Sequence, residues 1–288
     1  IDDVAEIRHP IVRAALTKFD LRAVDINSIA DIPAGTLLRF FDQHRLLDIS
    51  GRPTWLTVPG GSREYVRRLV DASGAHIRTR TPVTSIERSP ASSTVHTASG
   101  ERFEADEVVF ACHADTALQI LGDQATDDEK KVLGAFRFSE NHAVMHSDER
   151  LMPRSRRTWS AWNVLETEPG KPVTVTYWMN RLQSLHTDDD IFVTLNPTFE
   201  PERVHRTAWY SHPVFDPEAI AAQLRLSDIQ GRQRSWFCGA WSGYGFHEDG
   251  LESGMAVGRA LGGTVPWWDE VDPDSQAASI ADGVGVPR

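Results

Sequence analysis

The sequence predicts an α/β (α+β) fold in which segments that mix helices with strands flank a middle third rich in β-structure. Between residues 140 and 197, four β-rich runs are separated by proline, glycine and aspartate. This is the pattern of an antiparallel sheet with one solvated face. On either side, apolar residues recur at helical spacing beside short buried runs. A chain of 288 residues is long enough for one large domain or two ordinary ones.

The first predicted elements are two helices with a short strand between them. TLLRFFDQHRLL, residues 36–47, predicts an amphipathic helix because its leucines and phenylalanines recur three and four residues apart. WLTVPGG, residues 55–61, predicts a short strand that ends in a glycine turn. The segment 62–74 predicts a helix that begins at the N-cap Ser62 and ends at Gly74. One face of that helix is apolar and contains Tyr65, Val66, Leu69 and Val70.

Three predicted strands follow, over residues 76–89, 93–100 and 101–112. The pair Ser99-Gly100 predicts a hairpin turn between the second and the third strand. The third strand includes a short apolar run that we expect to be buried. Further helices are expected over residues 114–122 and 126–136.

The last third of the chain returns to a mixture of helix and strand. The Asp-Pro pair at 216–217 marks the start of a helix, since proline favours the first helical position. RSWFCGA, residues 234–240, predicts a strand, and LESGMAVGRALGG, residues 251–263, predicts a helix that starts near Asp249. The tail from Trp267, rich in Asp, Ser, Ala and Gly, is expected to be a flexible segment.

Composition and charge exclude several classes of protein. The net charge of -11 opposes binding to nucleic acid, because a phosphate backbone rewards clustered positive charge. No apolar run is long enough for a transmembrane helix, and no signal peptide is recognisable. Cys112 and Cys238 are far apart in the sequence and have no zinc-binding spacing, which fits a reducing compartment. We therefore expect a cytoplasmic protein without a structural metal.

The most unusual stretch is WFCGAWSGYGFHEDGLESG, residues 236–254, with five glycines between a predicted strand and a predicted helix. Backbone N–H groups and the positive end of a helix would meet there, and both favour an electron-rich ligand. Glycine lets a flat ring or a phosphate approach the main chain closely. A tight strand-to-helix connection, with glycine required only by the backbone angles, explains the same residues.

This stretch resembles the C-terminal signature FCGAxxGYGFHEDGLxSG of the flavin-containing amine oxidase superfamily, in its bacterial FAD-binding amine-oxidase-like branch. The resemblance continues in LLRFFDQHRLL, RPTWLTVPGGSREYVRRL, FACHADTALQIL, TWSAWN, VTVTYWMNRLQ, VTLNP and YSHPVFDP. Together these segments extend over about residues 29–262. The resemblance implies an FAD-dependent oxidoreductase that transfers hydride from a small or lipid-like organic substrate to flavin.

The resemblance also implies a domain organisation, an incomplete FAD/NAD(P)-binding-type domain with a mainly antiparallel β-sheet substrate domain. The FAD-binding-type domain is discontinuous in the sequence and is interrupted by the substrate domain. The expected ranges are a helical N-terminal arm over 1–54, FAD-binding-type segments over 55–122 and 228–266, the substrate domain over 123–227, and the tail over 267–288.

Residue roles transfer from the family only where the motif matches. The resemblance implies that Val83 meets the adenine, that Gly239 and Ala240 pass beside the ribityl and pyrophosphate portion, and that Phe246 lies near the flavin face. It also implies that amides at the helix start face the flavin ring where negative charge develops on reduction. These amides belong to Asp249, Gly250 and Leu251.

A substrate pocket is expected to include aromatic and amide side chains of the β-rich segment and the glycine turn. The same tryptophans could equally fill a sheet core. No catalytic general base is recognisable. The expected pocket residues are Trp162, Trp178, Asn180 and Tyr244.

The sequence lacks the G-x-G-x-x-G turn and the following acidic residue with which family members bind the dinucleotide. We therefore expect FAD affinity to be reduced, and we expect self-association or a partner chain that completes the fold. The alternative function is a flavin-free remnant that acts as a binding or assembly module.

Histidine chemistry gives a third and weaker hypothesis. His142 and His146 have a zinc spacing only if the segment is helical, and the surrounding sequence alternates like a strand. The triplet His247-Glu248-Asp249 is compact, but adjacent side chains point in different directions. A metallohydrolase is therefore the last of the three readings.

Overall fold

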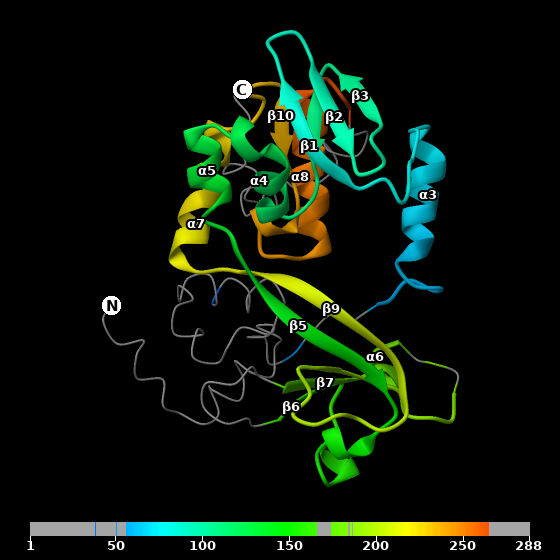
Figure 1. The fold of residues 1–288 in the computed structure, drawn as a ribbon. Coiled ribbons are helices and arrows are strands. Elements are labelled where there is room, and N and C mark those ends of the chain that lie inside the picture. The colour runs from blue at the N-terminus through cyan, green and yellow to red at the C-terminus, as the bar shows by residue number, and fades with distance from the viewer. Residues whose placement is uncertain are drawn as a thin grey trace. The chain divides into compact units, whose positions relative to one another are not determined.

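A computed structural model describes residues 56–165, 174–183 and 187–264, together with residues 38, 50 and 185. Helices mix with mainly antiparallel sheets, so the predicted α/β (α+β) class is confirmed (Figure 1). The chain divides into two compact units that are each discontinuous in sequence. Unit 1 comprises residues 1–76 and 138–212, and unit 2 comprises residues 77–137 and 213–288.

Unit 1 is built on the predicted antiparallel sheet, which has five strands in the order β6-β7-β8-β5-β9. The register places Trp162 opposite Tyr177 and Trp178 opposite Phe192. The long edge strand β9 was not predicted as a strand. The strands are β5 (Arg137–His146), β6 (Trp162–Leu165), β7 (Thr174–Trp178), β8 (Phe192–Leu195) and β9 (Val204–Val214).

One face of this sheet is both polar and buried. His146 is fully buried, and its Nδ1 accepts a hydrogen bond of 3.0 Å from the backbone N–H of Asp148. Its Nε2 therefore holds the hydrogen and donates to Thr194 Oγ1 at 2.7 Å, and the hydroxyls of Thr194 and Thr176 are 2.8 Å apart. Burial lowers the pKa of His146 to about 4. His146 is thus a satisfied histidine of a strand, as the alternating pattern indicated.

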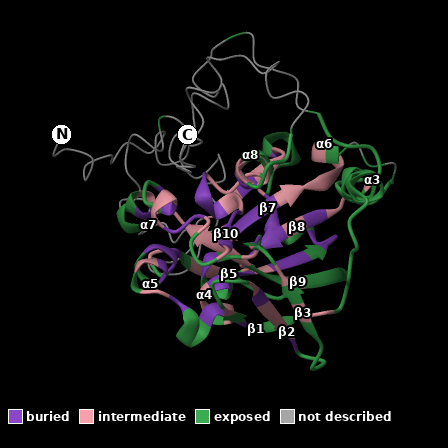
Figure 2. Cartoon of the chain, turned by 90° about the horizontal axis from the view of Figure 1, so that it is seen from above, coloured by how far each residue is buried: buried purple, intermediate pink, exposed green. Residues whose placement is uncertain are grey.

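Helix α3 (Arg63–Ser73) confirms the predicted helix and its end at Gly74, whose φ is 63°. Ser62 makes no capping hydrogen bond through its side chain. The apolar face is exposed, with Val66 at 49% and Leu69 at 58%, and Figure 2 shows the helix almost entirely in the colour of exposed residues. The strand predicted before it is wrong over its described residues, because 56–61 form a turn closed by Gly61 N–H to Val58 O at 2.9 Å.

Unit 2 contains a three-stranded antiparallel sheet in the order β1-β2-β3. The predicted hairpin turn is confirmed, since Gly100 has a φ of 83° and donates its N–H to Thr97 O at 3.0 Å. The strand predicted over 101–112 divides into two strands that belong to different sheets. The three strands of this sheet are β1 (Val83–Arg88), β2 (Ser93–Thr97) and β3 (Arg102–Ala105).

The second sheet of unit 2 is a parallel pair, β4 (Val108–Phe110) and β10 (Ser235–Phe237). Phe110 and Phe237 stack with ring centroids 5.2 Å apart. The buried side chain of Gln230 pairs with β10 like a short strand, because its amide donates to Phe237 O at 2.7 Å and accepts from Phe237 N–H at 2.9 Å. The pairing of β4 with β10 brings together two segments that are far apart in the sequence.

The predicted helices of unit 2 are confirmed as α4 (Ala114–Leu121), α5 (Asp127–Leu133), α7 (Pro217–Gln223) and α8 (His247–Ala260). Asp216 caps α7 by accepting the N–H of Ala219 at 2.8 Å, and proline follows it as predicted. Thr126 and Glu129 form a capping box at α5. Helix α5 contacts both α4 and α7.

The division between the two units falls at 137–138 and 212–213. The expected substrate domain over 123–227 stays a prediction. The segment that contains α3 is grouped with the sheet of unit 1. The predicted helix 36–47 lies outside the described residues except for Leu38, which is helical. Most of the predicted arm 1–54 and the whole tail 267–288 lie outside them as well.

Short helices complete the described chain. The predicted strand over 171–182 ends at Trp178 and continues as α6 (Met179–Gln183). In the part of the chain that the structure describes, no helix has the length and apolar character needed to cross a membrane. The 3-10 helices are η3 (Gly122–Gln124), η4 (Glu149–Leu151), η5 (Arg156–Thr158), η6 (Leu226–Asp228) and η7 (Ala240–Ser242).

Candidate functional site

The candidate site is the glycine-rich turn that follows β10 in unit 2. Cys238 extends the parallel ladder by donating its N–H to Phe110 O at 3.0 Å. Gly239 then turns the chain with a φ of 151°, and its N–H donates to Ser253 Oγ on α8 at 3.0 Å. The turn is tied from its first residue to the helix that follows it.

Three glycines of this turn leave space that the chain fills with its own side chains. A Cβ on Gly239 would lie 2.6 Å from Trp241 Nε1, and a Cβ on Gly243 would lie 2.4 Å from Asp249 Oδ1. Gly245 has a φ of 87° and is packed against Phe215. Close packing and backbone angles inside the chain therefore require glycine at these positions.

Gln223, the last residue of α7, binds the glycine turn through its side-chain amide. This buried side chain donates to Trp241 O at 3.1 Å and to Gly243 O at 2.7 Å. The indole N–H of Trp241 in turn donates to Cys112 O at 2.9 Å, at the end of β4. Reasoning from the sequence did not identify Gln223, because nothing in a glutamine at a helix end marks a contact 18 to 20 residues away.

Helix α8 begins at His247, two residues before the predicted start at Asp249. Asp249 accepts the backbone N–H of Phe246 at 2.7 Å, so its carboxylate caps the first turn. Phe246 is half-buried and Leu251 is 46% exposed.

The glycines of α8, at positions 250, 254 and 258, have space for a side chain, whereas the three glycines of the turn do not. A Cβ on Gly250 would meet only Ala240, at an ordinary contact of 3.7 Å, and a Cβ on Gly254 would meet nothing within 4 Å. Packing within the described chain therefore gives no reason for glycine at 250 and 254.

The first turns of α8 are acidic. Burial raises the pKa of Glu252, and the neighbouring Glu248 and Asp249 raise it further. Neither cysteine near the turn forms a disulfide, and burial raises the pKa of both thiols, that of Cys238 to about 11. These thiols are poor nucleophiles at neutral pH.

The remaining residue of the predicted cofactor set, Val83, is the first residue of β1, where it pairs with Thr97 and is 39% exposed. It belongs to the same unit as the glycine turn. Ala240 lies on η7 within the turn itself.

Trp162 and Trp178, two of the predicted pocket residues, lie on opposite faces of the sheet of unit 1. Trp162 faces Tyr177 across β6 and β7, with ring centroids 6.5 Å apart. Trp178 follows Tyr177 directly on β7 and so points to the opposite face. There it packs edge-on against Trp159 at 5.3 Å and donates to Asp190 at 2.9 Å.

The other two predicted pocket residues are Asn180, which has hydrogen-bond partners in its own loop, and Tyr244, which belongs to unit 2. Asn180 donates to Asp189 O at 2.8 Å and accepts the N–H of Ile191 at 2.8 Å, so both ends of its amide close the loop before β8. Tyr244 is half-buried in the glycine turn of unit 2. Among the described residues, no group of three or more His, Cys, Asp or Glu side chains is placed to hold a metal ion.

Residues 7–139 match the family model described as flavin containing amine oxidoreductase. The comparison with curated protein sequences gives no significant match. Among solved structures, the chain is similar to the putative protoporphyrinogen oxidase from Exiguobacterium sp. 255-15, with a TM-score of 0.56, 14% identity, 79% of this chain and 57% of that chain covered.

Two further structures are less similar. The cyclohexylamine oxidase from Brevibacterium oxydans IH-35A gives a TM-score of 0.49 and 12% identity over 70% of this chain and 53% of that chain. A fatty acid isomerase from P. acnes gives 0.47 and 14% identity over 69% and 52%. TM-scores below 0.5 do not establish a common fold. We therefore base the comparison of folds on the Exiguobacterium protein. The chain spans 57% of the length of that protein. The resemblance to flavin-containing amine oxidoreductases is thus confirmed, by the family match over residues 7–139 and by this likeness of fold.

Proposed function

We propose that the chain is an FAD-dependent oxidoreductase of amine-oxidase-like type that acts on a small or lipid-like organic substrate. The observation that supports this most directly is the match of residues 7–139 to flavin containing amine oxidoreductases. The start of α8 gives a second line of support, because a parallel strand pair ends there beside the positive end of a 14-residue helix.

The residues at the start of α8 fit a flat, electron-rich ring in three respects. Gly250 and Gly254 present a side without Cβ atoms, and the described chain does not fill it. The helix dipole favours negative charge at this end. Burial raises the pKa of Glu252, so the ionised form of its carboxyl group is less favourable than that of an exposed glutamate.

In this proposal Gly250, Leu251 and Asp249 would hold the ring through their backbone, and Gly239, Ala240, Phe246 and Val83 would meet other parts of the cofactor. Bound FAD would supply the acceptor for a hydride from the substrate carbon. The protein would orient that carbon and exclude water from it. Trp162, Trp178, Asn180 and Tyr244 are the predicted substrate contacts. Because Trp162 and Trp178 lie on opposite faces of the sheet, a substrate bound on one face would meet only one of them, and we propose Trp162, whose ring lies beside that of Tyr177.

Incubation with FAD followed by desalting tests the cofactor assignment. Wild-type protein is expected to remain yellow and to release FAD on denaturation. Gly250→Ala adds one methyl group at the proposed contact and is expected to reduce retained FAD by about tenfold. Gly258→Ala is the matched control two turns along the same helix, where a Cβ meets nothing within 4 Å, and it should retain flavin like the wild type.

The second candidate is a flavin-free module that binds a partner. The packing around Gly239, Gly243 and Gly245 supports it, because side chains of the chain itself occupy the space beside these glycines and no ligand is needed to explain them. Protein that stays colourless after incubation with FAD would leave this candidate in place of the oxidoreductase.

Association with a further chain is part of either proposal. The exposed apolar face of α3 supports it, since such faces are usually covered in a stable protein. Light scattering should give a mass above that of one chain of 32.1 kDa. A monodisperse monomer would count against association with a second copy.

A further inference from the structure

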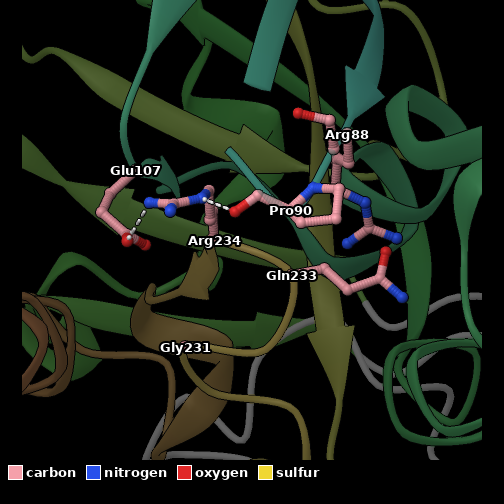
Figure 3. A pocket seen from close by; sticks show the side chains of 7 residues that line it. Arg88, Pro90, Glu107, Gly231, Gln233 and Arg234 are labelled. Carbon is pink, nitrogen blue, oxygen red and sulfur yellow. Dashed lines mark hydrogen bonds and ion pairs between the residues drawn. The ribbon is translucent and has the colours of Figure 1, made fainter. Parts of the chain in front are cut away.

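A second concave site lies at the other end of the parallel strand pair. A cavity of about 640 Å³ is lined by the last residue of β1 and the two residues after it, by the residue before β4, and by residues shortly before β10 (Figure 3). The glycine turn follows β10, so the cavity and the turn lie at opposite ends of that strand. The lining residues are Arg88, Ser89, Pro90, Glu107, Gly231, Gln233 and Arg234.

The wall of the cavity is held in one orientation by hydrogen bonds. Arg234 lies between Glu107 and Pro90, donating Nε to Pro90 O at 3.0 Å and Nη1 to Glu107 Oε1 at 3.3 Å (Figure 3). The other oxygen of Glu107 accepts the indole N–H of Trp236 at 2.9 Å. The arginine and the carboxylate are thus fixed before any ligand arrives, which lowers the entropy cost of binding.

Two residues of the cavity wall have backbone angles that are unfavourable for residues with a side chain. Gln233 has a φ of 48° and Arg234 a φ of 60°, so two consecutive residues with side chains adopt the left-handed conformation. This conformation is unfavourable for residues other than glycine. Gln233 and Arg234 are the two central residues of a hairpin turn, in which Ser235 N–H donates to Arg232 O at 3.1 Å, and a turn of this kind places both side chains at positions that glycine or asparagine would fill more favourably.

Polar groups on the wall lack partners within the described chain. The Gln233 side-chain amide makes no hydrogen bond with the described residues, and neither does Nη2 of Arg234. The Arg88 side chain is only 1% exposed, and its Nε is a buried donor without a partner. Burial closes Nε of Arg88 off from a ligand, so the groups that a ligand could reach are the amide of the exposed Gln233 and Nη2 of Arg234.

The charges on the wall select the class of ligand. Arg88 is paired with Glu129, and Arg234 with Glu107, so neither arginine has a full unbalanced charge for a dianion. A phosphate dianion would also be repelled by Glu107. A monoanion at the same distance meets half of that repulsion, and a planar one can accept from Arg234 and Gln233 at once. The volume suits an organic molecule rather than a bare inorganic ion.

We propose that this cavity binds a small organic carboxylate, with the carboxylate on Gln233 and Arg234 and the remainder of the molecule beside Pro90. The proposal is independent of flavin binding, because none of the lining residues belongs to the proposed cofactor set.

The probes are benzoate, its uncharged analogue benzamide, and inorganic phosphate, each titrated into the whole chain labelled with ¹⁵N. The indole N–H of Trp236 reports on the cavity, since it is bonded to Glu107 on the wall. Its signal is assigned with Trp236→Phe. Benzoate is expected to shift this signal saturably, with an affinity at least about tenfold higher than that of benzamide.

Gln233→Gly separates a binding role from a structural one. Glycine relieves the left-handed strain, so the thermal midpoint should rise while benzoate affinity falls by about tenfold. Arg234→Gln should also weaken benzoate by at least about tenfold. Arg232→Gln removes an equal charge from an exposed neighbour that does not line the cavity, and it should bind benzoate like the wild type.

Four results would overturn the proposal. They are the absence of a saturable shift with benzoate, tighter binding of phosphate or benzamide than of benzoate, unchanged benzoate affinity in Gln233→Gly, and an equal loss of affinity in Arg232→Gln and Arg234→Gln.

Discussion

Arg88 of β1 and Glu129 of α5 form a buried, two-point ion pair. The two Nη atoms of Arg88 donate to the two carboxylate oxygens at 2.6 and 2.9 Å, and both side chains are 1% exposed. Burial alone would raise the pKa of Glu129, but hydrogen bonds from Arg88 and from Thr126 outweigh it and lower the pKa. The pair joins the three-stranded sheet of unit 2 to its helices.

Removing one partner of this pair should be strongly destabilising. Arg88→Met leaves a buried carboxylate uncompensated and is expected to lower the free energy of unfolding by about 3 to 5 kcal/mol. Urea denaturation measures the change. The double variant Arg88→Met with Glu129→Leu should recover most of the loss. Arg67→Met at the exposed Arg67–Asp71 pair, whose side chains are 59% and 63% exposed, should cost at most about 1 kcal/mol. Equal losses in Arg88→Met and Arg67→Met would contradict a special role for the buried pair.

His146 should make stability depend on pH. Its pKa falls from 6.5 to about 4 on folding, so the unfolded chain binds the proton more readily. The contribution is fully present above pH 6.5 and is lost as the pH falls from there towards 4, with a total of about 3 kcal/mol. His146→Gln should flatten this part of the profile of unfolding free energy against pH. The control His76→Gln, at an exposed position, should leave it unchanged, and a flat wild-type profile in this range would refute the assignment.

The glycines of the turn and of the helix should respond oppositely to alanine. Gly239→Ala brings a methyl group against the Trp241 ring at a φ of 151° and should cost at least about 2 kcal/mol in unfolding free energy. Gly250→Ala meets only ordinary contacts and should stabilise α8 by about 1 kcal/mol. Thermal or urea unfolding of the two variants without flavin distinguishes them. Similar effects at both positions would show that the packing around Trp241 is not what requires glycine at 239.

Gln223 should be essential for the glycine turn although it is not part of it. Gln223→Leu leaves the buried carbonyls of Trp241 and Gly243 without their donor, which should cost about 1 to 3 kcal/mol. Gln119→Leu on α4 is the matched control, because Gln119 is exposed and has similar helix propensity. Urea midpoints measure both variants. If Gln119→Leu lowers the urea midpoint as much as Gln223→Leu does, the effect comes from introducing leucine and not from losing the hydrogen bonds of Gln223.

Local signals in the sequence predicted most of the helices and strands. Asp216 before Pro217 predicted the start of α7, and the Ser99-Gly100 pair predicted the β2–β3 turn, because caps and turns depend on neighbouring residues. The Thr126-x-x-Glu129 capping box at the start of α5 is a local signal of the same kind. The expected strand over 55–61 failed over its described residues because β-propensity needs a pairing partner, which 56–61 do not have.

The sequence by itself determined the α/β class, the antiparallel sheet of unit 1, most helix ends and the resemblance of the glycine-rich turn to flavin-containing amine oxidases. Only the tertiary structure decided which glycines face Trp241, Asp249 and Phe215, that Trp162 and Trp178 lie on opposite faces, and that Arg88 meets Glu129. The reason is that caps and turns are set by residues a few positions apart. By contrast, Arg88 and Glu129 are 41 positions apart, and Trp236 and Glu107 are 129 apart, so only the folded chain brings them together.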